Sequence, residues 1–173
     1  GMGVDKLVEN AAKNLLSGLD LSDWDLNGDG ILDRLLVLHS GNAQESGGPS
    51  DSIWSHFSTL SKPIEIGDWE IKHYTISSLE SGLGTLVHEM LHQMGAYDLY
   101  DVNSDLPSRT WKGLGDWDIM ASGNWNGNAM VPAMPGGATL ATINGPGIES
   151  INDELSQNTV SYTHLRAHET TSH

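Results

Sequence analysis

The segment HEMLH, residues 88–92, contains three side chains whose types and spacing suit a metal-dependent hydrolysis. Residues four apart in a helix lie on one face, one turn apart, so His88 and His92 can bind one tetrahedral zinc ion. Glu89 lies beside them, where a carboxylate can take a proton from a water molecule whose pKa the metal lowers. The pattern predicts a zinc site with Glu89 as general base, although these five residues also occur by chance on ordinary helices.

The residues after this segment supply a chain reversal and a candidate third ligand. Gly95 follows His92 by three positions, and glycine adopts the left-handed conformation that ends many helices. A reversal there brings Asp98 back toward the histidines, and we therefore predict that Asp98 is the third zinc ligand. Asp101 and Asp105 also lie nearby and remain alternatives, with Asp101 better suited to flank the helix or bind calcium.

A second group of possible metal ligands lies in the acidic segment DLNGDGILD, residues 25–33. Oxygen atoms at alternate residues can converge on one calcium ion, and Gly30 permits the sharp turn that such a loop needs. The predicted calcium ligands are the side chains of Asp25, Asn27, Asp29 and Asp33 and the carbonyl of Ile31. The loop is not an EF-hand, because Leu36 replaces the final glutamate. The alternative is a polar turn without an ion.

Longer segments around the zinc pattern resemble a known family. HEMLHQMGAYD (88–98) resembles the extended metzincin motif with aspartate as third ligand, and GDWDIMASGNWNG (115–127) resembles the Met-turn. The second resemblance implies that Met120 forms an apolar floor below the zinc. Further segments resemble the immune inhibitor A-like secreted metallopeptidases, over about residues 20–132: DLYD (98–101), WDIMASG (117–123), DLNGDGILDRLLVLHSG (25–41) and SIWSHF (52–57).

The resemblance implies an extracellular bacterial zinc endopeptidase that acts on protein or peptide substrates. The sequence departs from the family in two places. No tyrosine closely follows Met120, so none is assigned to the zinc or the transition state, and Tyr97 precedes Asp98 where proline is frequent. Trp117 and Trp125 are candidates for lining the substrate pocket or for packing. The lone histidines interpreted as packing or hydrogen-bonding residues are His39, His56 and His73.

Hydrophobic spacing predicts the elements that position these residues. An amphipathic helix begins near Val4 and ends near Gly18, and an active-site helix covers residues 80–95, with Ser77 and Glu80 at capping-box spacing. The apolar run at 34–40 predicts a buried strand, and further strands are expected at 52–58, 64–66 and 69–76. We therefore expect an α+β, zincin/metzincin-like catalytic domain, with a small mixed sheet and a loop-rich C-terminal half.

Composition limits the partners of the chain. The formal net charge of -15, from 23 acidic and 8 Lys and Arg residues, argues against binding to nucleic acid or an anionic membrane. The sequence has no cysteine, so disulfides and thiolate ligands are excluded. We expect a monomeric catalytic domain at residues 2–159, as a fragment of a longer secreted protein, and a non-native tail at 160–173. The tail histidines left out of the site are His164, His168 and His173.

Two other interpretations compete with that of an active enzyme. One is a calcium-stabilised binding module whose zinc site is catalytically silent, and the other is a truncated fragment with an incomplete cleft. Glu89 favours the enzyme, because a purely structural zinc site has no use for a general base beside it.

Overall fold

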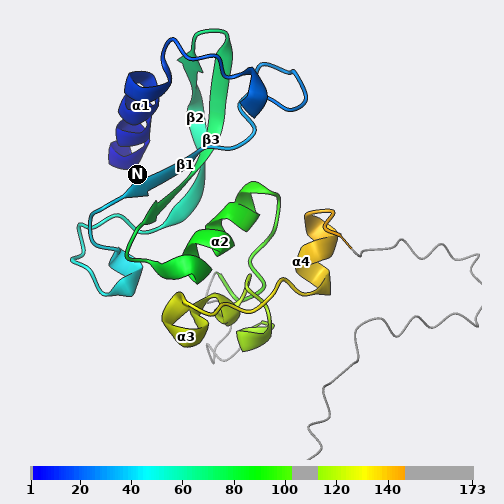
Figure 1. Ribbon diagram of the computed structural model, residues 1–173. Helices are drawn as coiled ribbons and strands as arrows, with labels where there is room; N and C mark the ends of the chain where they lie inside the picture. Colours follow the sequence, from blue (N-terminus) through cyan, green and yellow to red (C-terminus); the bar gives the residue numbers. More distant parts are fainter. Residues whose placement is uncertain (1, 103–112, 147–173) are drawn as a thin grey trace, which may run out of the picture.

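A computed structural model describes residues 2–102 and 113–146 and has the mixed α and β content expected from the sequence (Figure 1). A three-stranded sheet follows the first long helix, and a second long helix leads into a C-terminal part of short helices and loops. The helices and strands are α1 (Met2–Leu16), β1 (Leu36–His39), β2 (His56–Ile66), β3 (Trp69–Ser78), α2 (Gly82–Gln93), α3 (Asn126–Ala129) and α4 (Gly137–Thr142). Among the described residues, no helix is both long and apolar enough to cross a bilayer.

The sheet is mixed, as predicted, with β3 between the other two strands. β1 pairs with β3 in parallel, and β2 pairs with it antiparallel across the turn at Gly67 and Asp68. The strand expected at 52–58 begins only at His56 and continues to Ile66. Residues before it bond to the preceding loop instead of to β3, because Ile53 O accepts the Gln44 N–H and the Ser55 N–H donates to Glu45.

The strand predicted at 34–40 is present as β1 (Leu36–His39), but the prediction that it is buried is wrong. β1 lies at an edge of the sheet, and its outward-facing Leu36 and Leu38 are 36% and 48% exposed. Val37 packs against the core with Leu35. A continuous apolar run is typical of strands covered on both faces, but this strand has a covered face and an open one.

The two long helices cover opposite faces of β3 (Figure 1). Successive side chains of a strand point to opposite faces. The Tyr74 hydroxyl donates to Asp5 in α1, and the neighbouring Thr75 hydroxyl donates to the Glu89 carbonyl in α2. The larger hydrophobic core lies on the α1 side. It consists of Val8, Ala12, Leu21, Leu32, Ile64, Ile66, Ile71, Tyr74 and Ile76.

The helix expected at residues 80–95 is α2, which covers Gly82–Gln93, and the predicted capping box at Ser77 and Glu80 is wrong. Ser77 is the penultimate residue of β3, where it is buried and bonds to the hydroxyl of Ser55. Ser81 takes the N-cap position, but its hydroxyl donates to the Glu45 carboxylate instead of capping the helix. Sequence spacing could not show that β3 continues through Ser77 to end at Ser78.

Candidate metal centre and cleft

The side chains of His88 and His92 meet on one face of α2, with their Nε2 atoms 3.2 Å apart. The Nδ1 atom of each ring bonds to a backbone carbonyl, that of Ile119 at 2.7 Å and that of Ala96 at 2.9 Å. A carbonyl only accepts, so each Nδ1 carries a proton, and the Nε2 of a ring without a second proton turns its lone pair toward its neighbour. Two lone pairs at this distance repel each other, and a cation between them would remove the repulsion.

The turn at Gly95 brings Asp98 to the same place. Gly95 has a φ of +101°, a conformation that side chains rarely adopt. Its N–H donates to His92 O, and the Ala96 N–H donates to Leu91 O, so the helix ends and the chain reverses. Asp98 Oδ1 lies 3.2 Å from His88 Nε2 and 3.3 Å from His92 Nε2.

These three atoms fit a tetrahedral metal ion. With zinc–ligand bonds of about 2.0–2.1 Å, tetrahedral ligands lie about 3.3–3.4 Å apart, close to the separations of Asp98 Oδ1 and the two Nε2 atoms. Asp98 Oδ1 is buried and receives no hydrogen bond. Within the described ranges, these residues form the only group of three His, Asp or Glu whose ligand atoms lie within 4.8 Å of one another. Asp101 is not in the group, and Asp105 lies outside the described residues.

Glu89 lies beside the three ligand atoms without joining them. Its Oε1 is 4.0 Å from His88 Nε2, and its Oε2 accepts the Phe57 N–H at 2.8 Å. Phe57 lies on the edge strand β2, and an edge strand has backbone N–H groups that do not pair within the sheet. Burial raises the pKa of the Glu89 carboxyl, and the nearby His88 only partly opposes this. A raised pKa makes the carboxylate a stronger base.

Met120 lies under this part of α2. Its side chain is fully buried in a small hydrophobic cluster with Leu91, Ala96 and Ile119. Its carbonyl accepts the Leu99 N–H at 2.7 Å, directly after Asp98 in the chain. The segment around Met120 therefore has two links to the candidate ligands. Ile119 O bonds to the ring of His88 on α2, and Met120 O bonds to the loop that carries Asp98.

The sequence is similar to that of known proteins. Residues 7–138 match the catalytic domain of the family described as immune inhibitor A peptidase M6. The chain belongs to this M6 peptidase family. It is 33% identical over 158 residues to Immune inhibitor A of Bacillus thuringiensis subsp. alesti, covering 72% of this chain and 22% of that protein. It is 29% identical over 147 residues to Pre-pro-metalloprotease PrtV of Vibrio cholerae, covering 72% and 16%. The chain thus spans about a fifth of the length of these relatives. The predicted membership of a metallopeptidase family is confirmed.

Asp118 is a structural residue of this M6 domain that the sequence reasoning missed. It is buried, and its carboxylate accepts the Met120 N–H and the Gly136 N–H, each at 2.8 Å. The Thr139 hydroxyl lies 2.9 Å and 3.0 Å from its two oxygens. Asp118 therefore joins the Met120 segment to α4. The sequence signal was an acidic residue directly before the apolar run at 119–121.

Replacing Asp118 with alanine should lower the free energy of unfolding by about 3 kcal/mol or more, since each buried donor left unsatisfied costs about 1–3 kcal/mol. Urea unfolding measures the change. Asp116→Ala is the matched control, because Asp116 is exposed two residues earlier and should have little effect. Equal midpoints for the two variants would show that Asp118 does not hold this region together.

A cleft of about 230 Å³ opens beside the metal-binding candidates in the M6 domain, and both His88 and Glu89 line it. Trp125 lines it too, whereas Trp117 is 89% exposed and is not part of its wall. Tyr100 contributes a hydroxyl, and burial together with the negative charge of Asp98 raises the Tyr100 pKa to about 12. Tyr100 precedes Met120 in the chain, so it was not predicted from the residues that follow Met120.

The lone histidines take no part in the metal-binding group of the described residues. His56 bonds to Trp54 O and to the Tyr74 hydroxyl, in line with the predicted hydrogen-bonding role. His73 packs against Phe57 with ring centroids 5.9 Å apart. Burial lowers the pKa of His73.

The acidic loop at 25–33 is folded by its own hydrogen bonds. Asp25 accepts the N–H groups of residues 28, 29 and 30, and Asp29 accepts the Ile31 N–H. Asp33 accepts the Leu26 N–H from across the loop, while Asn27 Oδ1 accepts the Asp29 N–H. The loop carboxylates do not form a three-atom group like that of the zinc candidates.

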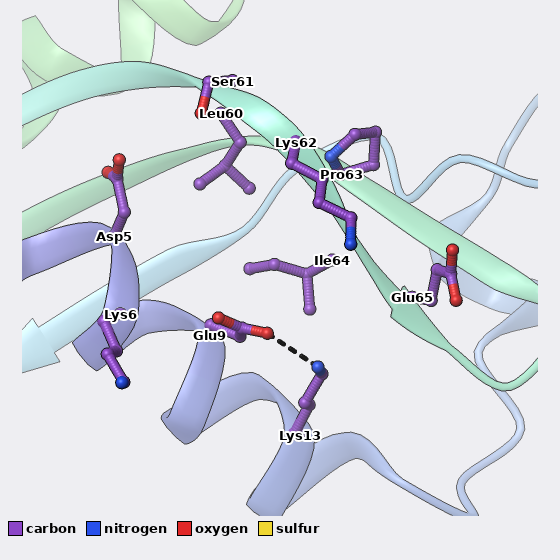
Figure 2. A pocket seen from close by; sticks show the side chains of 10 residues that line it. All are labelled: Asp5, Lys6, Glu9, Lys13, Leu60, Ser61, Lys62, Pro63, Ile64 and Glu65. Carbon is purple, nitrogen blue, oxygen red and sulfur yellow. Dashed lines mark hydrogen bonds and ion pairs between the residues drawn. The ribbon is translucent and has the colours of Figure 1, made fainter. Parts of the chain in front are cut away.

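A separate pocket of about 340 Å³ lies between α1 and β2 (Figure 2). Its wall includes an ion pair between Glu9 and Lys13, one helical turn apart at 2.7 Å, and the side chain of Lys62 on β2. None of the predicted zinc, calcium or catalytic residues lines this pocket, so it is not part of the candidate metal centre.

Proposed function

We propose that this domain is a zinc-dependent endopeptidase that hydrolyses extracellular proteins, with zinc bound by His88, His92 and Asp98. The observation that carries the proposal is the mutual separation of 3.2–3.3 Å among the two Nε2 atoms and Asp98 Oδ1. A metzincin-like fold with Met120 below the zinc belongs to the same proposal. Support comes from the M6 family match and from the name of PrtV, a metalloprotease.

Glu89 is the general base in this mechanism. When bound, zinc supplies a Lewis acid that polarises the peptide carbonyl and lowers the pKa of the attacking water. The Phe57 N–H holds Glu89 Oε2, which leaves Oε1, the oxygen nearer His88, to accept the proton of that water. Glu89 then donates the proton to the amine of the departing peptide. The carbonyls of Ile119 and Ala96 keep the histidine rings in the metal-binding tautomer.

The protein should contain about one zinc per chain and cleave casein. A zinc chelator should stop the cleavage, and restored zinc should return it, because the three-ligand site leaves a coordination position open for catalysis. Metal analysis of protein purified without added zinc, run beside the casein assay, tests both points. If the protein contains stoichiometric zinc but cleaves no peptide of a broad library, the peptidase proposal is wrong. The function is then that of a catalytically silent binding module.

We also propose that the loop at 25–33 binds calcium through Asp25, Asn27, Asp29, Asp33 and the Ile31 carbonyl. The ligand types and their alternate spacing support this. Millimolar calcium should raise the melting temperature of chelator-treated protein, since a ligand that binds only the folded state stabilises it. Asp29→Ala should remove most of the rise, while Asp51→Ala, at an exposed residue outside the loop, should keep it. An unchanged melting curve with calcium would contradict the site.

A further inference from the structure

A carboxylate outside the metal centre is held on the wall of the same cleft. Glu45 lies in the short turn Gln44–Ser46, and its side chain lines the cleft with His88 and Glu89. Its Oε1 accepts the Ser81 hydroxyl at 2.7 Å and its Oε2 accepts the Ser55 N–H at 3.1 Å. These bonds fix the carboxylate in one position, because Ser55 and Ser81 are themselves buried and lie 2.9 Å apart through their hydroxyls.

The charge of Glu45 has no cationic partner among the described residues, whose ion pairs are all made by other carboxylates. Burial raises the pKa of Glu45, but the hydrogen bonds from Ser55 and Ser81 outweigh burial and leave it below its ordinary value. The group is therefore ionised at neutral pH. A half-buried, ionised carboxylate with no counter-charge favours a cation that enters the cleft.

Two further acceptor atoms on the cleft wall have no partner. Asn124 Oδ1 and Thr85 Oγ1 are buried without a hydrogen bond, and their residues are only 6% and 3% exposed. Buried polar atoms are nearly always bonded, so unpartnered ones at a cleft point to a ligand that supplies the missing bonds. An N–H donor that enters the cleft would supply the kind of bond that these acceptor atoms lack.

Two tryptophans also belong to this wall. Trp54 and Trp125 line the cleft and are 54% and 43% exposed. A tryptophan ring packs well against the methylene stem of a long side chain and attracts a cation above its face. Aromatic walls and a fixed carboxylate together match an amphipathic cation better than an apolar or acidic group.

We propose that Glu45, Asn124 and Thr85 form a subsite for a lysine or arginine side chain of the substrate, close to the scissile bond. The inference rests on the proposed peptidase function, because the subsite shares its cleft with His88 and Glu89. The net charge of -15 acts in the same direction by attracting cationic peptides. The substrate class of this domain is thus proteins and peptides with a lysine or arginine near the cleaved bond.

The test compares peptides that carry lysine or norleucine at each position flanking the cleaved bond, because norleucine lacks only the ammonium group. The wild-type domain should cleave the best lysine peptide with kcat/KM about 10- to 100-fold above its norleucine twin, the size of a hydrogen-bonded charge interaction. Glu45→Gln should bring the ratio near one. Glu80→Gln, at an exposed residue outside the cleft, is the matched control and should keep the wild-type ratio.

Binding of the same peptides, measured by calorimetry, separates this inference from the peptidase proposal. Equal cleavage of lysine and norleucine peptides at every position would overturn the subsite and leave the peptidase. Selective lysine binding that Glu45→Gln abolishes, without cleavage, would support the subsite and overturn the peptidase. If circular dichroism shows that Glu45→Gln is unfolded, Asn124→Ala replaces it, and an unchanged lysine preference in the folded variant overturns the subsite.

Discussion

Replacing Glu89 with glutamine should lower the rate of peptide hydrolysis by about 10²–10⁴-fold, the usual contribution of a general base. Glutamine has the same shape, and its carbonyl oxygen can still accept the Phe57 N–H that Glu89 Oε2 accepts. It cannot take a proton from water at neutral pH. Zinc content should stay at the wild-type level, since Glu89 is not one of the three clustered ligands. Cleavage of a labelled peptide, measured beside zinc content, checks both expectations.

Glu80→Gln is the matched control for this change, because it removes an exposed carboxylate just before α2. It should retain wild-type hydrolysis. Full activity in the Glu89→Gln protein would contradict the role of Glu89, whereas loss of zinc from that protein would mean that Glu89 helps to bind the metal.

Replacing His88 with alanine should weaken zinc binding by more than about 100-fold and abolish stoichiometric zinc. Changes to groups that only orient a ligand already cost about 10- to 100-fold in affinity, and this change removes the ligand itself. The cavity left behind is buried, since His88 is 4% exposed, so circular dichroism must first show that the variant is folded. Titration with a competing chelator gives the affinity, and His39→Ala, on β1, is the control that should bind normally.

The third ligand can be tested by a pair of matched changes in the same loop. Asp98→Asn removes the charge that lies within 3.3 Å of both histidines, and it should weaken zinc binding strongly. Asp101→Asn should leave zinc binding near the wild-type level, because Asp101 is not in the clustered group. The reverse result would move the third ligand to Asp101.

The parts of the site that could be predicted are those fixed by short stretches of chain. Helical periodicity places His88 and His92 together, and a glycine at position 95 permits the reversal that carries Asp98 to them. Both relations join residues at most ten positions apart in the sequence. Nothing beyond local geometry was needed to predict that these side chains approach one another.

Contacts between distant segments could not be predicted in this way. The Phe57 N–H reaches Glu89 across 32 positions, and His88 reaches Ile119 O across 31. Glu45 meets Ser81 across 36 positions, so its place on the cleft wall could not be predicted from its neighbours in the chain. The apolar run in β1 was equally ambiguous, because hydrophobicity alone does not show whether both faces of a strand are covered.

The unequal size of the two hydrophobic cores has a consequence for heat tolerance. The core around the sheet and α1 has nine buried residues, whereas the cluster with Met120 has four. The metal-binding candidates depend on the smaller cluster through Ile119 O and the Leu99–Met120 bond. We therefore expect warming to inactivate the domain while the sheet is still folded. Substitutions that fill or tighten the region around Met120 should then extend the working temperature range more than changes near α1, as residual activity after heating would show.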